Sequence, residues 1–61
     1  MPIVTIQESA GRSREQRDEL LARLTQAFVD AYGVPAESVT VFFNSYSSED
    51  WGKAGKLAYQ R

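Results

Sequence analysis

Residues 13–33, SREQRDELLARLTQAFVDAYG, decide the fold because they carry the pattern of one long amphipathic helix. Ser13 and Gln16 have the spacing of a capping box, in which the two side chains bond the first free amides of a helix. Gly33 is the residue type that most often follows the end of a helix. Apolar residues recur between them at helical spacing, as on a buried helix face: Leu20, Leu21, Leu24, Ala27, Phe28, Ala31 and Tyr32. We therefore predict a helix that begins after Ser13 and ends at Gly33.

Two β-rich stretches flank this helix. Ile3 to Gln7 begins with a run of β-branched residues and is predicted to be the first strand, followed by a polar loop over 8–11. Residues 35–38 are predicted to form a single turn, and Val39 to Asn44 the second strand. Strand, helix and strand in this order form a βαβ unit, in which the strands run parallel with a right-handed crossover.

One helix covers only one face of a two-stranded sheet, so the other face needs a second cover. Phe42 falls on the face opposite Val41 and Phe43, and we expect Val4 or Ile6 of the first strand to share it. Ordering this chain costs roughly 90 kcal/mol, whereas burying about 60% of its unfolded surface contributes roughly 80–90 kcal/mol. A short chain with so small a margin and no cysteine gains stability by associating, so we expect an oligomer.

Residues 45–61 combine turn formers with large apolar side chains. The turn formers include Gly52 and Gly55, and the apolar residues are Trp51, Leu57 and Tyr59. This segment is too apolar for a disordered tail, so we expect a small hairpin or arm that docks on a neighbouring subunit. The chain, residues 1–61, is thus predicted to be one α+β domain: a βαβ subunit with two parallel strands, one long helix and a C-terminal hairpin.

Composition argues against several functional classes. Lys and Arg total 7 against 8 for Asp and Glu, a net charge of -1, whereas a nucleic-acid-binding domain would carry a basic stripe. The chain has no Cys and no His, so we expect no disulfide and no metal site. No apolar run approaches the length of a membrane span, and the N-terminus lacks the pattern of a secretory signal, so we expect a cytoplasmic protein.

Pro2 is the first candidate for catalysis. Removal of Met1 would leave Pro2 with a free secondary amine at the start of a strand. A model α-amine titrates at about 7.7–8.0, and burial or a nearby cation lowers that pKa toward neutrality, where a base suits proton transfer. The alternative is that Pro2 simply begins an edge strand, where its missing N–H costs nothing. If Met1 stays, the Pro2 nitrogen is an amide and cannot act as a base.

Arg12 and Trp51 supply a context for that amine. Arg12 directly precedes the helix cap, where free N–H groups favour an anion, so it could hold a substrate carboxylate bidentately. Trp51 could form the apolar wall of a pocket and lower the amine pKa by desolvation. The alternatives are a solvated loop arginine and a core or interface anchor. The adjacent carboxylates Glu49 and Asp50 are interpreted as turn residues.

These features, taken in order, resemble the 4-oxalocrotonate tautomerase family. The resemblance covers nearly the whole chain and is carried by the Met-Pro-Ile opening, Gly11-Arg12-Ser13 followed by Glu15-Gln16, the Leu-rich helix, and Asp50-Trp51-Gly52 with Gly55. It implies a tautomerase-like subunit, usually assembled as a homohexameric trimer of dimers, with no metal and no organic cofactor. It also implies that Pro2 is a general base that moves a proton between oxygen and carbon of an enol. Arg12 would bind a substrate carboxylate, and Trp51 would be the pocket aromatic.

Two positions depart from the family pattern. The best-known members carry a second substrate-binding arginine on the second strand, where this chain has Thr40. A threonine hydroxyl brings no charge, so a monocarboxylate enol such as phenylenolpyruvate is as consistent a substrate as the dicarboxylate 2-hydroxymuconate. Asn44 or Tyr46 could supply the missing donor. The chloroacrylate dehalogenase branch has a water-activating glutamate where this chain has Lys53, which argues against a dehalogenase or hydratase.

The leading hypothesis is therefore an enol–keto tautomerase that acts on a small 2-hydroxy-dienoate or enolpyruvate-type carboxylate. Two alternatives stay open. The chain could be a non-enzymatic oligomeric binding module, which Thr40 and a retained Met1 would favour and which predicts no enol turnover. It could instead be one subunit of a hetero-oligomeric tautomerase, in which a partner chain supplies the missing arginine.

Overall fold

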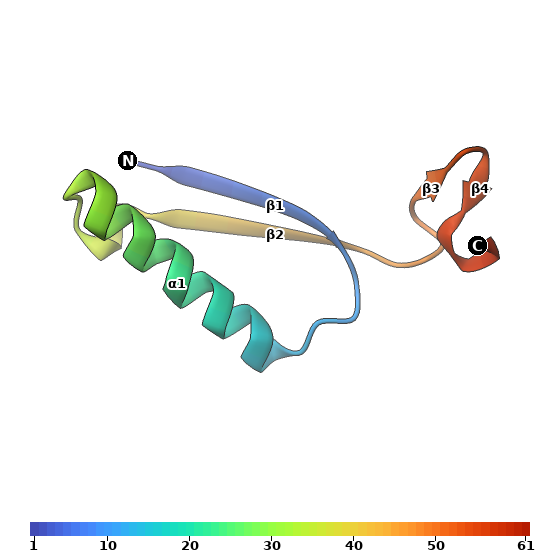
Figure 1. The fold of residues 1–61 in the computed structure, drawn as a ribbon, viewed down its shortest axis with the longest axis horizontal. Coiled ribbons are helices and arrows are strands. Elements are labelled where there is room, and N and C mark those ends of the chain that lie inside the picture. The colour runs from blue at the N-terminus through green and yellow to red at the C-terminus, as the bar shows by residue number, and fades with distance from the viewer.

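The computed structural model describes all residues 1–61 and has the predicted order of elements (Figure 1). Strand β1 spans Ile3–Ser9, helix α1 spans Arg14–Tyr32, and strand β2 spans Thr40–Tyr46. A 3₁₀ turn over Ala36–Ser38, η1, connects α1 to β2. The strands β1 and β2 pair in parallel, which confirms the βαβ unit.

The C-terminal segment forms the expected hairpin. Strand β3 (Gly52–Lys53) pairs antiparallel with strand β4 (Lys56–Leu57), and a 3₁₀ turn over Ala58–Gln60, η2, follows. The hairpin lies beyond the carboxyl ends of β1 and β2, away from α1 (Figure 1). The α+β class with a C-terminal hairpin is therefore confirmed.

Both long strands run further toward their carboxyl ends than the sequence predicted. The predicted loop over 8–11 is wrong for Glu8 and Ser9, which continue β1, and β2 continues through Tyr46. The reason is that these residues pair across the sheet, ending with Ser9 opposite Tyr46, so that the partner strand satisfies their backbone polar groups. The Ala10 amide extends this ladder by donating to the Tyr46 carbonyl at 2.7 Å.

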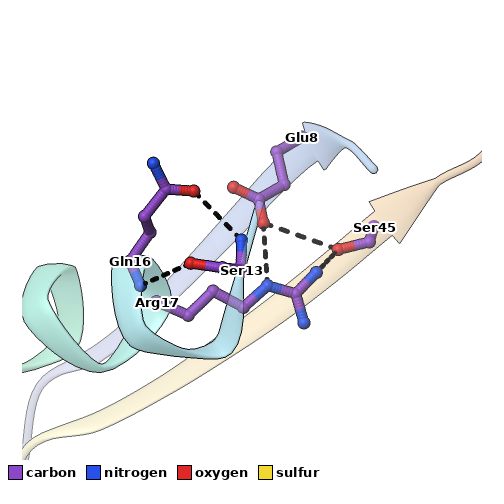
Figure 2. Close-up of polar contacts among 5 residues, drawn as sticks. All are labelled: Glu8, Ser13, Gln16, Arg17 and Ser45. Carbon is purple, nitrogen blue, oxygen red and sulfur yellow. Dashed lines mark hydrogen bonds and ion pairs between the residues drawn. The ribbon is translucent and has the colours of Figure 1, made fainter. Parts of the chain in front are cut away.

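The two ends of α1 are as predicted. The Ser13 hydroxyl accepts a bond from the Gln16 amide at 3.1 Å, and the Gln16 side chain accepts one from the Ser13 amide at 3.0 Å (Figure 2). At the other end Gly33 adopts φ 69°, and its amide donates to the Val29 carbonyl at 3.0 Å. These caps satisfy backbone groups that a helix leaves free, so the helix begins and ends at defined residues.

Alternation along the strands separates a helix-covered face from an open face of the sheet. In β1 the half-buried positions are Val4, Ile6 and Glu8, and these share the covered face. The prediction that Val4 or Ile6 lies on the opposite face was therefore wrong. Ile3 takes that place, 62% exposed, on the same face as Phe42, 54% exposed.

The single chain has no fully buried residue. Its accessible surface is 4819 Å², whereas a compact folded protein of this mass exposes about 4,000 Å². Its radius of gyration is 14.8 Å, against about 10.5 Å for a compact domain of this length. The sheet and helix thus leave apolar surface uncovered, including Leu20, Leu21 and Tyr32 of the predicted helix stripe. The helix is also too polar to cross a bilayer.

Candidate active site

Pro2 and Thr40 lie side by side at the amino-terminal ends of the parallel strands. The Pro2 carbonyl accepts a hydrogen bond from the Thr40 amide at 3.0 Å, and Ile3 is opposite Thr40 in the sheet. Both Pro2 and Thr40 are half-buried. Met1 is 86% exposed. Because Met1 is bonded to Pro2 in this form of the chain, the Pro2 nitrogen is an amide without a basic lone pair.

Arg12 lies at the opposite end of the sheet, in the loop between β1 and α1. This loop is held on both sides, by the bond from the Ala10 amide to β2 and by the capping box that begins at Ser13. Between them Gly11 adopts φ 123°, a conformation that side chains disfavour. The Arg12 side chain is exposed and forms no ion pair, so its guanidinium is free to bind an external anion.

Trp51 also lies at this carboxyl end, between the sheet and the hairpin. A turn places it there: the Asp50 amide donates to the Ser47 carbonyl at 2.9 Å, and the Ser47 hydroxyl donates to the Asp50 carboxylate at 3.0 Å. The Trp51 side chain is 39% exposed and lines a hollow of about 330 Å³ with Gln7, Glu8, Ser9 and Tyr46. The interpretation of Asp50 as a turn residue is confirmed.

Asn44 and Tyr46, the two possible replacements for the second-strand arginine, differ in their hydrogen bonding. Asn44 is exposed in β2, opposite Gln7. The Tyr46 hydroxyl already donates to the Gln7 side chain at 3.0 Å, and Tyr46 lines the same hollow as Trp51. Neither lies next to Pro2, because several residues of β2 separate them from Thr40.

A single chain keeps Pro2 apart from Arg12 and Trp51. Strand β1 lies between the two sets of residues, and its rise of about 3.3 Å per residue places Pro2 about 23 Å from Ser9. Figure 1 shows the N-terminus at one end of the sheet and the hairpin at the other. The candidate site residues therefore fall into two separate groups, which we call half-sites: Pro2 with Thr40, and Arg12 with Trp51.

Glu8, Arg17 and Ser45 form a polar cluster that was not predicted from the sequence (Figure 2). The Arg17 Nε atom lies 3.4 Å from a Glu8 carboxylate oxygen, and Arg17 Nη2 donates to the Ser45 hydroxyl. The side-chain periodicity of β1 and α1 contained a signal for this cluster. Glu8 continues the covered positions of β1, and Arg17 continues the apolar stripe of α1, so both charges point inward from their elements. Elsewhere no three acidic side chains gather as a metal site would require.

Comparison with known proteins identifies the family. The family model described as tautomerase enzyme matches residues 2–61. The 2-hydroxymuconate tautomerase of Comamonas testosteroni is 38% identical over 58 residues, which cover 95% of this chain and 92% of that protein.

Solved structures of related proteins have the same fold as this chain. A homologue of 4-oxalocrotonate tautomerase superposes with a TM-score of 0.92 at 28% identity, over 100% of this chain and 97% of that one. The heterohexamer 4-oxalocrotonate tautomerase from Chloroflexus aurantiacus superposes with a TM-score of 0.84 at 28% identity, over 98% and 97% of the two chains. Because sequence and fold agree over nearly its whole length, the chain belongs to the tautomerase family of enzymes.

Proposed function

We propose that the chain is an enol–keto tautomerase that uses the amino-terminal amine of Pro2 as its general base and needs no cofactor. The observation that carries this proposal is the position of Pro2, directly before β1 and tied to β2 through its carbonyl. A base held by a rigid element keeps its lone pair in one place, which suits proton transfer. The family match, which begins at Pro2, supports the same role.

The reaction moves one proton and shifts the double bonds. The neutral Pro2 amine accepts the proton of the enol hydroxyl, and the electron pair of the O–H bond becomes part of a carbonyl. The carbon–carbon π pair shifts along the conjugated system to a carbon atom, which takes the proton back from the Pro2 ammonium. Arg12 holds the substrate carboxylate through charge-assisted hydrogen bonds, and Trp51 supplies the apolar wall.

The complete site combines the half-sites of different subunits. A small carboxylate cannot span β1, which separates Pro2 from Ser9 by about 23 Å and has the two half-sites at its opposite ends. We propose that Pro2 of one subunit meets Arg12 and Trp51 of another in a homo-oligomer, a trimer of dimers. The open sheet face with Ile3 and Phe42 and the absence of any fully buried residue support association.

Thr40 supports the proposed substrate class. Its hydroxyl can donate one hydrogen bond to a substrate oxygen, but it leaves the half-site of Pro2 without a second cation. We propose a small 2-hydroxy-dienoate or enolpyruvate-type carboxylate, with Arg12 as the carboxylate partner. Asn44 and Tyr46 reach the site only if subunit packing brings them to it. A related chain is named a 2-hydroxymuconate tautomerase, so this dicarboxylate and the monocarboxylate phenylenolpyruvate are the first two compounds to assay.

The test begins with the intact mass of the purified chain, because only a chain that starts at Pro2 has the free amine. In that form, Pro2→Ala should lower kcat/KM by about 100-fold or more, the usual contribution of a general base. Native mass spectrometry should show the same assembly for both proteins. Pro35→Ala, which changes the chain's other proline in the turn before η1, is the matched control and should keep its activity. Full activity of the Pro2→Ala variant would contradict the proposal.

Thr40 also favours two other functions. A non-enzymatic binding module predicts no turnover of either compound by chains that are shown to start at Pro2. A hetero-oligomeric tautomerase predicts weak turnover by the pure chain that rises when a co-purified partner with an arginine at the position of Thr40 is added.

A further inference from the structure

Glu8, Arg12 and Arg17 border one hollow at the carboxyl end of the sheet, and its charges depend on each other. We propose that Arg17 keeps Arg12 available for substrate by holding the carboxylate of Glu8 away from it. Arg17 is thus a positioning residue that acts through Glu8. This inference rests on the proposed function, because it takes Arg12 as the group that binds the substrate carboxylate.

The hollow has a volume of about 280 Å³ and is lined by Glu8, Arg12, Gln16, Arg17 and Leu20. It contains two guanidinium groups and one carboxylate, which leaves a surplus of one positive charge. That surplus is what an incoming carboxylate requires, because oppositely charged groups attract each other. The positive charge of Arg12 stays unpaired only while the carboxylate of Glu8 is paired with Arg17.

The carboxylate of Glu8 is held by two neighbours. Its Oε2 atom lies 3.4 Å from Arg17 Nε and accepts a bond from the Ser45 hydroxyl at 3.5 Å (Figure 2). Arg17 in turn donates to Ser45 and stands over the ring of Phe43, with its guanidinium carbon 5.7 Å from the ring centre. The side chains of Glu8 and Arg17 are only 20% and 36% exposed. Arg12 takes no part in this cluster, although it borders the same hollow.

Without Arg17, Glu8 would compete with the substrate. Both carry a carboxylate, and an arginine binds either one through the same pair of hydrogen bonds. A carboxylate on the same chain is present at high effective concentration, whereas the substrate must come from solution. With Arg17 neutralised, Arg12 becomes the remaining cation of the hollow. We therefore expect Glu8 to occupy Arg12 and to raise the substrate concentration needed for binding.

The pair of Glu8 and Arg17 is poorly suited to a purely stabilising role. Arg17 Nε is buried without a hydrogen bond of good geometry, so the pair lacks the two parallel bonds of a strong arginine–carboxylate contact. Partly exposed ion pairs contribute little to stability. Substitution of Arg17 should therefore change the charges of the hollow and leave the fold in place.

The experiment measures kcat and KM for phenylenolpyruvate in the assembled protein. Arg17→Gln should raise KM roughly three- to fivefold, the effect of one partly exposed charge pair, with kcat unchanged. Adding Glu8→Gln to the Arg17→Gln chain removes the competitor and should restore KM. Arg17→Lys keeps the charge and should keep KM near its original value.

Arg23→Gln is the matched control. It makes the same charge change on α1 by breaking the exposed Glu19–Arg23 pair, whose atoms lie 2.7 Å apart, and it should leave KM unchanged. An unchanged KM in the Arg17→Gln variant would overturn the inference. So would a raised KM that Glu8→Gln does not restore, because a structural loss would persist in the double variant.

A binding measurement separates this inference from the proposed function. Trp51 is the only tryptophan, so quenching of its fluorescence can report the affinity of phenylpyruvate, the keto product, without turnover. If Arg17→Gln weakens binding and the added Glu8→Gln restores it while Pro2→Ala stays fully active, the inference holds and the proposed base is wrong. If Pro2→Ala abolishes turnover while affinity and KM stay flat across the Arg17 and Glu8 variants, the inference is wrong and the base stands.

Discussion

The two ends of the β1–β2 sheet are built in different ways. At the amino-terminal end, the backbone bond from Thr40 to the Pro2 carbonyl positions the candidate base. At the carboxyl end, side chains from both strands and the helix form the cluster of Glu8, Arg17 and Ser45 beside Arg12 (Figure 2). This difference in construction reflects what each end must do, because a base needs only one nitrogen at a fixed place. Recognition of an anion depends on how several charges are shared, and more elements must cooperate to set that arrangement.

The largest expected effect comes from separating the two ends onto different chains. Pro2→Ala and Arg12→Gln chains should each be nearly inactive alone. Mixed in equal amounts and reassembled, they should regain about a quarter of the original activity, because random assembly gives half of the sites an intact Pro2 and half an intact Arg12. Turnover assays measure the recovered activity, and native mass spectrometry verifies that the two kinds of chain have mixed.

A second mixture provides the control for that experiment. Original chains reassembled with chains that carry both substitutions should give about a quarter of the activity if the two ends meet between chains, and about half if they meet within one chain. No recovery in the first mixture, together with half activity in the second, would show that each chain completes its own site.

A medium effect is expected from adding charge to the amino-terminal end. Thr40→Arg places a cation beside Pro2, where the original chain has only a hydroxyl. It should raise the ratio of kcat/KM for 2-hydroxymuconate over phenylenolpyruvate by about tenfold or more, since a charge-assisted hydrogen bond contributes at least about 1.5 kcal/mol. Thr40→Gln adds length without charge and should change the ratio little. A Thr40→Arg ratio equal to that of Thr40→Gln would show that this end does not contact the second carboxylate.

The smallest expected effect concerns the anchoring of Arg12. Ser13→Ala removes half of the capping box and should lower the free energy of unfolding by about 1 kcal/mol, with a small rise in KM. Chemical denaturation at fixed protein concentration measures the first effect. Ser48→Ala, which changes an exposed serine whose side chain forms no hydrogen bond, should leave stability unchanged. Equal stabilities of the two variants would mean that the cap does not hold this loop.

The sequence predicted the ends of the helix better than the ends of the strands. Local contacts fix the helix ends, whereas pairing between distant residues fixes the strand ends. The capping box of Ser13 and Gln16 joins residues three apart, and Gly33 bonds back to Val29, so both signals are local. The carboxyl ends of β1 and β2 depend on each other across a long connection. The pairing of Ser9 with Tyr46 is visible only once the strands are placed side by side.

The site was predicted as a set of residue types and not as an arrangement. Pro2, Arg12 and Trp51 were selected by their chemistry and by resemblance, but the length of β1 puts Pro2 at one end of the sheet and the other two at its opposite end. A strand's length follows from pairing, which the sequence did not fix. Glu8 and Arg17 were overlooked for a related reason, since their contact requires the covered face of β1 to be known first.

The absence of any fully buried side chain in the single chain has a consequence for folding. In the proposed oligomer, apolar surface leaves water mainly when chains meet, so collapse and association form one reaction whose extent depends on protein concentration. The melting temperature should rise with concentration, and dilution alone should act as a denaturant. Refolding should likewise slow as the solution becomes more dilute, because the rate-limiting encounter is between chains.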